Sequence, residues 1–266
     1  MRRLESTRNP FVKFLQLLDS KSKDRRTEGL FLVEGIRELH LAAVNNYSID
    51  QILFCPDFIS VGDASKEVGI GLKGDTEWIE LSKEVSDKLF YRKGIRNVLG
   101  VCRTKSNDIN DLQLKENPLI LIIETVEKPG NLGAMLRTAD AAGASAVIVC
   151  DAATDIYNPN VVRSSLGCLF SVPVAVANNQ EVFSWLQQNG IKSFAAHLDA
   201  KKYHYEEDLS GPIAIVMGSE ANGLSTIWEQ EADAMIKIPM LGQHDSMNVS
   251  NAAAVLLFEA VRQRVV

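Results

Sequence analysis

The run PLILIIE, residues 118–124, is apolar almost without interruption. A strand with one face in water alternates apolar and polar residues, whereas a strand covered on both faces stays apolar throughout. The run therefore predicts a strand inside a mostly parallel sheet with helices on both faces. Further strands are predicted in AVIVC, FSVPVAVA, KSFAAHL, PIAIVMG and AMIKI, separated by helices at Leu132–Gly143, Asn160–Leu166, Val182–Gln188 and Thr226–Glu231.

Residues 1–106 predict a second, smaller α/β unit. Strand patterns in GLFLVEG, QILFC, TEWIEL and VLGVCRT alternate with helix patterns in IRELHLAAV and SKEVSDKLF, after an amphipathic helix at Phe11–Leu18. The stretch SKSKDRRTEG after that first helix is too polar to pack, and we expect an exposed basic loop there. A linker at about residues 105–117, with little apolar periodicity, separates this unit from a domain at residues 107–266.

Charge divides unevenly between the two parts of the chain. Residues 1–106 hold 18 Lys and Arg against 15 Asp and Glu, whereas residues 107–266 hold 10 against 19. The first thirty residues alone carry eight basic residues and four acidic ones. Such a basic arm can neutralise the phosphates of a polyanion, but it is equally consistent with a solvated helix face.

Several classes of protein are disfavoured by composition. No run of about 18 apolar residues is present, and MRRLESTRNP is not followed by the apolar segment of a secretory signal, so we expect a cytoplasmic protein with no membrane partner. The four cysteines form no CxxC pair, and the four histidines are scattered, so we expect reduced thiols and no metal site. The GxGxxG pattern at Gly69–Gly74 lies between a polar helical stretch and a strand, which is the wrong context for a dinucleotide site.

Polar loops follow three of the predicted strands, at 129–131, 218–223 and 241–248. Functional loops of parallel sheets gather at the carboxyl ends of strands. The third loop is the richest, since Ser246, Asn248, Ser250 and Asn251 directly precede the helix pattern AAAVLLFEAV. A helix cap needs only one such residue, so the surplus indicates a polar ligand beside the helix, although a rich cap remains the plainer interpretation.

The segments EKPGNLGAMLRTADAAG, IVMGSEANGLS and IKIPMLGQHDSMNVSNAAAVLLFE resemble the three motifs of the SpoU (TrmH) family of ribose methyltransferases, in the SPOUT superfamily. The resemblance covers about residues 117–262, and GLFLVEGIRELHLA is similar to the start of the family's small N-terminal RNA-binding domain. It implies a C-terminal α/β SPOUT domain with a deep trefoil knot, an S-adenosylmethionine pocket made by the knotted loops, and a homodimer. The C-terminal helix would serve as the dimer contact, although its sequence would equally suit an internal core helix.

The resemblance also implies roles for particular residues. It assigns Gly218, Ile238 and Met247 to S-adenosylmethionine, and Asn131, Arg137, Glu220, Ser246 and Asn248 to the reacting ribose. A guanidinium stays protonated in proteins, so we expect Arg137 to clamp a phosphate and stabilise negative charge on the 2′ oxygen rather than to accept the proton. Glu220 is expected to order its loop by accepting backbone N–H bonds. His244 and Asp245 are interpreted as loop residues.

Each of these residues also has a purely structural interpretation. Arg137 is typical of the exposed side of an amphipathic helix, Asn131 of a turn, and Glu220 of a helix N-terminus. Their joint occurrence in three strand-end loops favours an enzyme. The resemblance implies that this enzyme is an S-adenosylmethionine-dependent RNA 2′-O-ribose methyltransferase acting on ribosomal RNA and not on DNA. The alternatives left open are a transfer RNA methyltransferase and a non-catalytic RNA-binding or ribosome-assembly factor.

Overall fold

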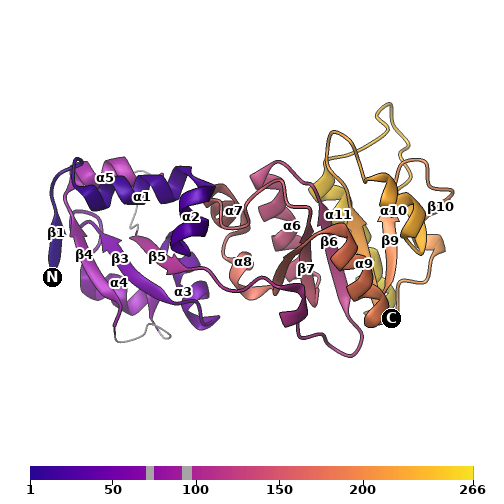
Figure 1. The fold of residues 1–266 in the computed structure, drawn as a ribbon, viewed down its shortest axis with the longest axis horizontal. Coiled ribbons are helices and arrows are strands. Elements are labelled where there is room, and N and C mark those ends of the chain that lie inside the picture. Colours follow the sequence, from indigo (N-terminus) through magenta and orange to yellow (C-terminus); the bar gives the residue numbers. More distant parts are fainter. Residues whose placement is uncertain (70–74, 92–97, 266) are drawn as a thin grey trace. The chain divides into compact units, whose positions relative to one another are not determined.

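The computed structural model describes residues 1–69, 75–91 and 98–265. The chain divides into two compact units, one made of residues 1–105 and 155–171 and the other of residues 106–154 and 172–266 (Figure 1). The first unit thus takes in a short segment from the middle of the second half of the chain. Within the described residues, no helix is both long and apolar enough to cross a membrane.

The N-terminal unit contains a five-stranded mixed sheet in the order β1-β4-β3-β5-β2. The predicted strands are confirmed, and β5 runs antiparallel to both β2 and β3. The amino-terminal strand β1, which we did not predict, pairs in parallel with β4. The elements are β1 (Arg2–Leu4), α1 (Pro10–Ser20), β2 (Leu30–Glu34), α3 (Ile36–Val44), β3 (Ile49–Phe54), α4 (Val61–Val68), β4 (Glu77–Leu81), α5 (Lys83–Leu89) and β5 (Val98–Arg103).

The prediction of an exposed basic loop after α1 is wrong as to the loop, although Lys21, Lys23 and Arg26 are exposed as expected. Residues Ser22–Glu28 form helix α2, which ends where Gly29 adopts a left-handed conformation with φ of +63°. Arg25 is only 2% exposed, and its guanidinium donates to the Leu18 carbonyl at 2.7 Å and pairs with Asp155 Oδ2 at 2.7 Å. The polar stretch packs because its one buried arginine has both a carbonyl and a carboxylate as partners.

Residues 155–171 pack against the N-terminal unit. This segment carries α7 (Pro159–Ser165) and α8 (Cys168–Ser171). The Tyr157 ring lies 4.4 Å from that of Phe31, and the Phe170 ring lies 5.0 Å from that of Tyr47. The helix predicted at 160–166 is therefore present, but it belongs to this unit and does not cover the C-terminal sheet.

The Gly69–Gly74 pattern lies mostly outside the described residues. Gly69 ends α4 with φ of +70°, and β4 follows at Glu77. The flanking helix and strand are those predicted, while the conformation of the glycine pattern itself stays untested.

The C-terminal unit is built on a seven-stranded sheet in the order β10-β12-β9-β11-β6-β7-β8, in which every described pair is parallel. Every residue of β6 is buried, as its apolar run predicted. The strands are β6 (Leu119–Glu124), β7 (Ala146–Cys150), β8 (Val174–Ala177), β9 (Lys192–Ala196), β10 (Lys202–Tyr203), β11 (Ile213–Met217) and β12 (Ala234–Lys237).

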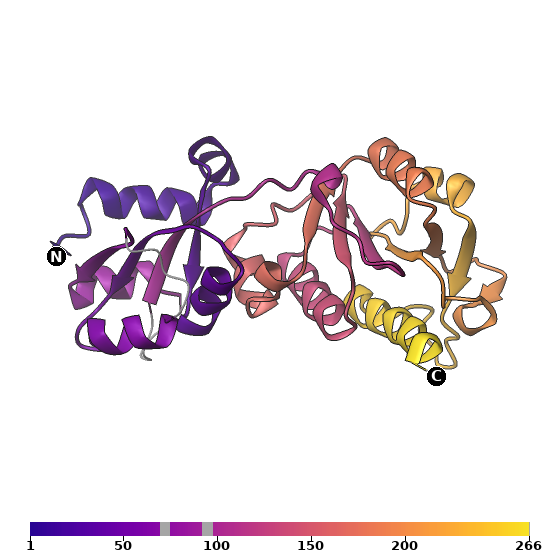
Figure 2. The same cartoon turned by 90° about the horizontal axis from the view of Figure 1, so that it is seen from below.

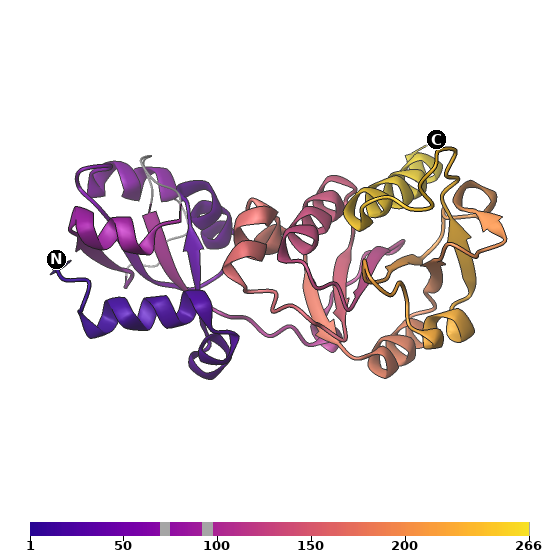
Figure 3. The same ribbon diagram turned by 90° about the horizontal axis from the view of Figure 1, so that it is seen from above.

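Helices cover both faces of this sheet, which confirms the predicted architecture. Helices α6 (Pro129–Ala141) and α11 (Val249–Val265) lie side by side on one face (Figures 2 and 3). Helices α9 (Asn179–Gln188) and α10 (Thr226–Glu231) cover the other, where Trp185 and Trp228 join the buried core with strand residues such as Ile120. Short 3₁₀ turns η1 (Ile109–Asp111) and η2 (His204–Glu206) complete the unit.

The strand order explains where a site can form. Strands β6, β11, β9 and β12 are consecutive neighbours and run in the same direction. Their carboxyl ends therefore lie along one edge of the sheet, and the loops that follow them meet there.

Candidate active site

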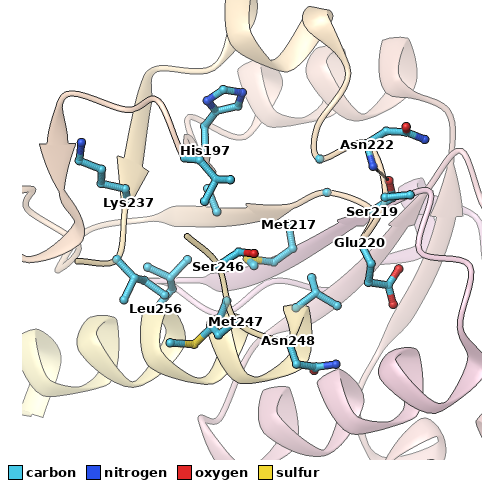
Figure 4. A pocket seen from close by; sticks show the side chains of 18 of the residues that line it. His197, Met217, Ser219, Glu220, Asn222, Lys237, Ser246, Met247, Asn248 and Leu256 are labelled. Atoms are coloured by element: carbon cyan, nitrogen blue, oxygen red, sulfur yellow. Dashed lines mark hydrogen bonds between the residues drawn. The ribbon is translucent and has the colours of Figure 1, made fainter. Parts of the chain in front are cut away.

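A pocket of about 580 Å³ lies at the carboxyl ends of β9, β11 and β12 (Figure 4). Its walls come from the loops after these strands and from the start of α11. Lining residues include Lys128, His197, Leu198, Asp199, Met217, Gly218, Ser219, Glu220, Asn222, Ile236, Lys237, Ile238, Met240, Ser246, Met247, Asn248, Ala252 and Leu256. Apolar side chains with a few polar groups are typical of a small-molecule site, and the volume falls within the range of such sites.

The loop after β11 is a closed turn. Ser219 N donates to the Gly223 carbonyl at 2.9 Å, and Gly223 N donates back to the Ser219 carbonyl at 3.1 Å. A Cβ atom built on Gly218 would lie 2.2 Å from the Gly223 carbonyl carbon, so only glycine fits at 218 without a backbone shift. The close approach of these two backbone segments shapes one wall of the pocket.

Three of the polar residues predicted from the motifs are linked by hydrogen bonds beside one end of the pocket, where Glu220 and Asn248 line the wall and Asn131, which is not a lining residue, joins them. Asn131 Nδ2 donates to Glu220 Oε1, and Asn248 Nδ2 donates to Asn131 Oδ1 at 3.2 Å. These residues follow β6, β11 and β12, so the arrangement depends on the strand order and not on sequence proximity. Among the described residues, the hydrogen-bond partner of Glu220 is the Asn131 side chain rather than the backbone N–H groups that we expected.

Local structure fixes two of these side chains. Asn131 lies in the first turn of α6, which begins at Pro129, a residue suited to the first helical position. Asn248 directly precedes α11, and its Oδ1 accepts from Ser250 N at 3.0 Å, as a helix cap does. Asn248 can therefore cap α11 and contribute to the site at the same time, because its Oδ1 accepts from the helix backbone and its Nδ2 donates to Asn131.

The remaining predicted residues fall into two groups. Gly218, Ile238, Ser246 and Met247 all line the pocket, and Figure 4 shows Ser246 and Met247 between Glu220 and Leu256. Ser246 Oγ lies 3.1 Å from Asp245 Oδ1. Arg137 does not join them within one chain.

Arg137 is exposed on α6 and is not part of the pocket wall. It follows Asn131 by six residues, which at about 100° per residue turns it about 240° around the helix from Asn131. The side of α6 that carries Arg137 is therefore not the side that carries Asn131. His244 is also exposed and lies outside the pocket lining.

Sequence reasoning missed the loop after β9. His197 lines the pocket, and its Nε2 lies 3.3 Å from Glu229 Oε1 while its Nδ1 accepts from Asp199 N at 3.2 Å. The only signal was its place near the end of the predicted strand KSFAAHL, because the sequence does not reveal that β9 lies between β11 and β12. Within the described part of the chain, no group of three or more His, Cys, Asp or Glu residues is arranged to hold a metal.

A parallel α/β domain with a pocket at its strand ends is typical of enzymes that bind a small cofactor beside a polar reaction site. Residues 118–258 match the model of the SpoU rRNA Methylase family, and residues 9–100 match the MRM3-like substrate binding domain. The chain belongs to the SpoU rRNA methylase family, as its three motifs predicted.

Relatives match either nearly the whole chain or about half of it. A 23S rRNA (uridine(2479)-2′-O)-methyltransferase of Streptomyces viridochromogenes is 30% identical over 276 residues, covering 99% of this chain and 93% of that protein. The 23S rRNA (guanosine-2′-O-)-methyltransferase RlmB of Pseudomonas putida is 43% identical over 148 residues, but the match covers only 55% of this chain and 60% of that protein.

Two solved structures are similar to this chain over the residues of both units. A crystal structure described as an RNA 2′-O ribose methyltransferase superposes with a TM-score of 0.84 at 36% identity, covering 99% of this chain and 100% of that one. The SpoU methyltransferase AviRb from Streptomyces viridochromogenes, in complex with AdoMet, gives 0.89 at 29% identity, covering 97% and 99%.

Proposed function

We propose that this protein transfers a methyl group from S-adenosylmethionine to a ribose 2′-hydroxyl of ribosomal RNA. The observation that carries the proposal is the hydrogen-bonded group Asn131, Glu220 and Asn248 at one end of a cofactor-sized pocket. Support for the substrate comes from relatives that act on 23S rRNA and that align along nearly the whole chain.

The pocket suits S-adenosylmethionine. We assign Gly218, Ile238 and Met247 to its binding, because they line the pocket and combine a side-chain-free backbone segment with apolar surface. When bound, this cofactor supplies a methyl group already activated by a sulfonium charge. The trefoil knot implied by the family stays a prediction.

The protein's own task is then to prepare the hydroxyl. Forming an alkoxide outright at neutral pH costs about 7 kcal/mol, at about 1.4 kcal/mol per pKa unit. Asn131, Ser246 and Asn248 can orient the ribose by hydrogen bonds, which lowers the entropy cost of in-line attack. Arg137, a permanent cation, clamps the adjacent phosphate and stabilises charge growing on the 2′ oxygen, while the phosphate or a water takes the proton.

This role of Arg137 requires a homodimer, which is part of the proposal. Arg137 is exposed on α6, and α11, which packs beside α6, exposes the large apolar side chains Val255 (37%) and Phe258 (47%). Exposed apolar residues on one helix are typical of a surface that a second copy covers. Pairing through this face would bring Arg137 of the partner subunit towards the pocket.

The N-terminal unit is proposed to hold the RNA. Its basic arm exposes Arg2, Arg8, Lys13, Lys21, Lys23 and Arg26, whereas the buried Arg25 serves the fold. Exposed cations can neutralise RNA phosphates. A cytoplasmic location is part of the same proposal, since Cys55, Cys102 and Cys150 are buried thiols outside any disulfide.

The test is methyl transfer from labelled S-adenosylmethionine to purified ribosomal RNA and, separately, to transfer RNA. We expect label in ribosomal RNA, a loss of about a hundredfold or more for Arg137→Ala, and no comparable loss for His244→Ala, the matched exposed residue. Label in transfer RNA alone would favour the transfer RNA enzyme. Failure of the wild type to bind S-adenosylmethionine would favour a non-catalytic RNA-binding factor.

A further inference from the structure

Glu124 is a buried carboxylate beneath the pocket loops. It is the last residue of β6 and is 1% exposed. No ion pair to Glu124 occurs within the described residues, so its charge is balanced by hydrogen bonds alone. Burying a carboxylate without a cation is unfavourable unless its oxygens accept hydrogen bonds. The donors that bind Glu124 therefore indicate which segments it holds in place.

Those contacts join four chain segments. Glu124 Oε2 accepts from Ser225 N at 2.8 Å, and Oε1 accepts from Ser225 Oγ at 2.5 Å and from Asn179 Nδ2 at 2.8 Å. Asn179 Nδ2 also donates to Asp151 Oδ2 at 2.6 Å, and its Oδ1 accepts from Cys150 Sγ at 3.0 Å. One carboxylate therefore links the ends of β6 and β7 to the starts of α9 and α10.

Ser225 is the residue at which the pocket loop after β11 ends. That loop starts from Met217, which pairs with Ile123 of β6 in the parallel ladder. Ser225 returns to the next residue of β6, where Glu124 binds both its N–H and its hydroxyl. Both ends of the 218–224 loop are thus fixed to the last two residues of β6, by backbone at one end and by the carboxylate at the other.

We propose that Glu124 is a positioning residue that holds the 218–224 loop in its binding conformation. By fixing Ser225 it keeps Gly218 against Gly223 and holds Glu220 where Asn131 can donate to it. A preorganised loop does not have to be ordered when the ligand binds, so affinity rises without a direct contact. The effect on cofactor binding rests on the proposed function, whereas the effect on the loop does not.

The chemistry makes the residue type testable. Three donors converge on Glu124, and an ionised carboxylate is an acceptor only. Glu124→Gln replaces one acceptor oxygen by an NH₂ group, which would face at least one of these donors and could not accept from it. The glutamine side chain is nearly equal in size to glutamate. The substitution therefore removes at least one of the three hydrogen bonds without leaving a cavity.

The chain offers a matched control at the opposite edge of the same sheet. Asp233 Oδ2 accepts from Ser193 N at 2.8 Å and from Ser193 Oγ at 3.0 Å. This pair joins the amino ends of β9 and β12, away from the pocket. Asp233→Asn neutralises the same kind of serine-binding carboxylate without touching the 218–224 loop.

The experiment compares wild type, Glu124→Gln and Asp233→Asn by amide hydrogen exchange of residues 219–224 and by S-adenosylmethionine titration. We expect Glu124→Gln to speed exchange of the loop amides about tenfold or more and to raise the Kd for S-adenosylmethionine about tenfold or more, since a hydrogen bond to a charged group is lost. Asp233→Asn should leave both unchanged. Equal loop exchange in the two variants would overturn the proposal.

Two further outcomes are separable. If Glu124→Gln does not fold, Ser225→Ala removes only the hydroxyl contact, and the proposal then requires a smaller change in the same direction at 219–224. If the wild type does not bind S-adenosylmethionine, the proposed function fails, while the exchange of the loop amides still decides whether Glu124 positions the loop.

Discussion

The two sheets of this protein differ in strand direction, and that difference decides where polar residues can act together. In the N-terminal unit, β5 runs antiparallel to β2 and β3. The carboxyl end of β5, and the loop that follows it, therefore lie at the opposite edge of the sheet from the carboxyl ends of β2 and β3. In the C-terminal unit every described pair is parallel, and four consecutive strands deliver their loops to one edge. Only the second arrangement gathers polar side chains from distant motifs into one pocket.

The two units also differ in the role of a buried charged residue. In the N-terminal unit, Arg25 pairs with Asp155 and ties together segments 130 residues apart. In the C-terminal unit, Glu124 is buried directly beneath the pocket loop. Altering the first is expected to change stability, whereas altering the second is expected to change ligand binding.

The largest effect is expected from Gly218→Ala in the C-terminal unit. Its Cβ would lie 2.2 Å from the Gly223 carbonyl carbon, so the loop must move. We expect S-adenosylmethionine binding, measured by calorimetry, to weaken about a hundredfold or more, because the backbone conformation that shapes the pocket is lost. Gly242→Ala is the control, since no heavy atom lies within 4 Å of the corresponding Cβ. Unchanged binding by the 218 variant would show that this wall is not used.

In the N-terminal unit, Arg25→Ala should destabilise the fold by about 3–5 kcal/mol, because it leaves Asp155 and two carbonyls without their buried partner. Denaturant unfolding measures the loss, and the neighbouring exposed Arg26→Ala should change stability by less than about 0.5 kcal/mol. At temperatures where the variant stays folded, its affinity for S-adenosylmethionine should match the wild type. If Arg25→Ala weakened S-adenosylmethionine binding without destabilising the fold, the claim that Arg25 affects stability alone would be contradicted.

A smaller effect is expected from Lys21→Ala with Lys23→Ala, two exposed cations of the basic arm. RNA affinity should fall, and the slope of log affinity against log salt should decrease by about 0.7–0.9 for each phosphate contact removed. Filter binding at several salt concentrations measures this, with S-adenosylmethionine affinity as the control. An unchanged slope would mean that these cations form a solvated helix face and no more.

The smallest effect is expected from Arg262→Ala on α11. The hydrogen bond from Arg262 is the main reason that the pKa of Glu259 falls from its usual 4.5 to about 2. A lowered folded-state pKa stabilises the protein above the unfolded-state value and loses that contribution as pH falls from about 4.5 towards 2. Since Arg262 is 61% exposed, solvent screening should keep the loss of stability at pH 7 small, and the loss should vanish near pH 2 in pH-dependent unfolding. A pH-independent difference would assign the effect to helix packing instead.

Much of the C-terminal fold could be predicted because its signals are local. The apolar run at 118–124 and the polar loops at strand ends follow from periodicity and turn chemistry, and the motifs located Asn131, Glu220 and Asn248. The order of strands is not a local property, so the loop after β9, with His197, could not be assigned to the pocket.

The errors in the N-terminal unit have the same origin. The stretch at 20–29 seemed too polar to pack because the partner of Arg25 is Asp155, far along the chain. The segment 155–171 joins this unit through aromatic contacts with Phe31 and Tyr47, which no pattern in either segment reveals. Pairings between distant residues remain out of reach of a single sequence.

The most direct test of the central claim is the chemical position of the transferred methyl group. Ribosomal RNA labelled by the wild-type protein is digested to nucleosides and analysed by mass spectrometry, with Asn131→Ala in parallel. The account predicts a single 2′-O-methylated ribonucleoside, with label greatly reduced in the variant. Label on a base, or equal labelling by the variant, would contradict a ribose-methylating site at the strand ends of the C-terminal sheet.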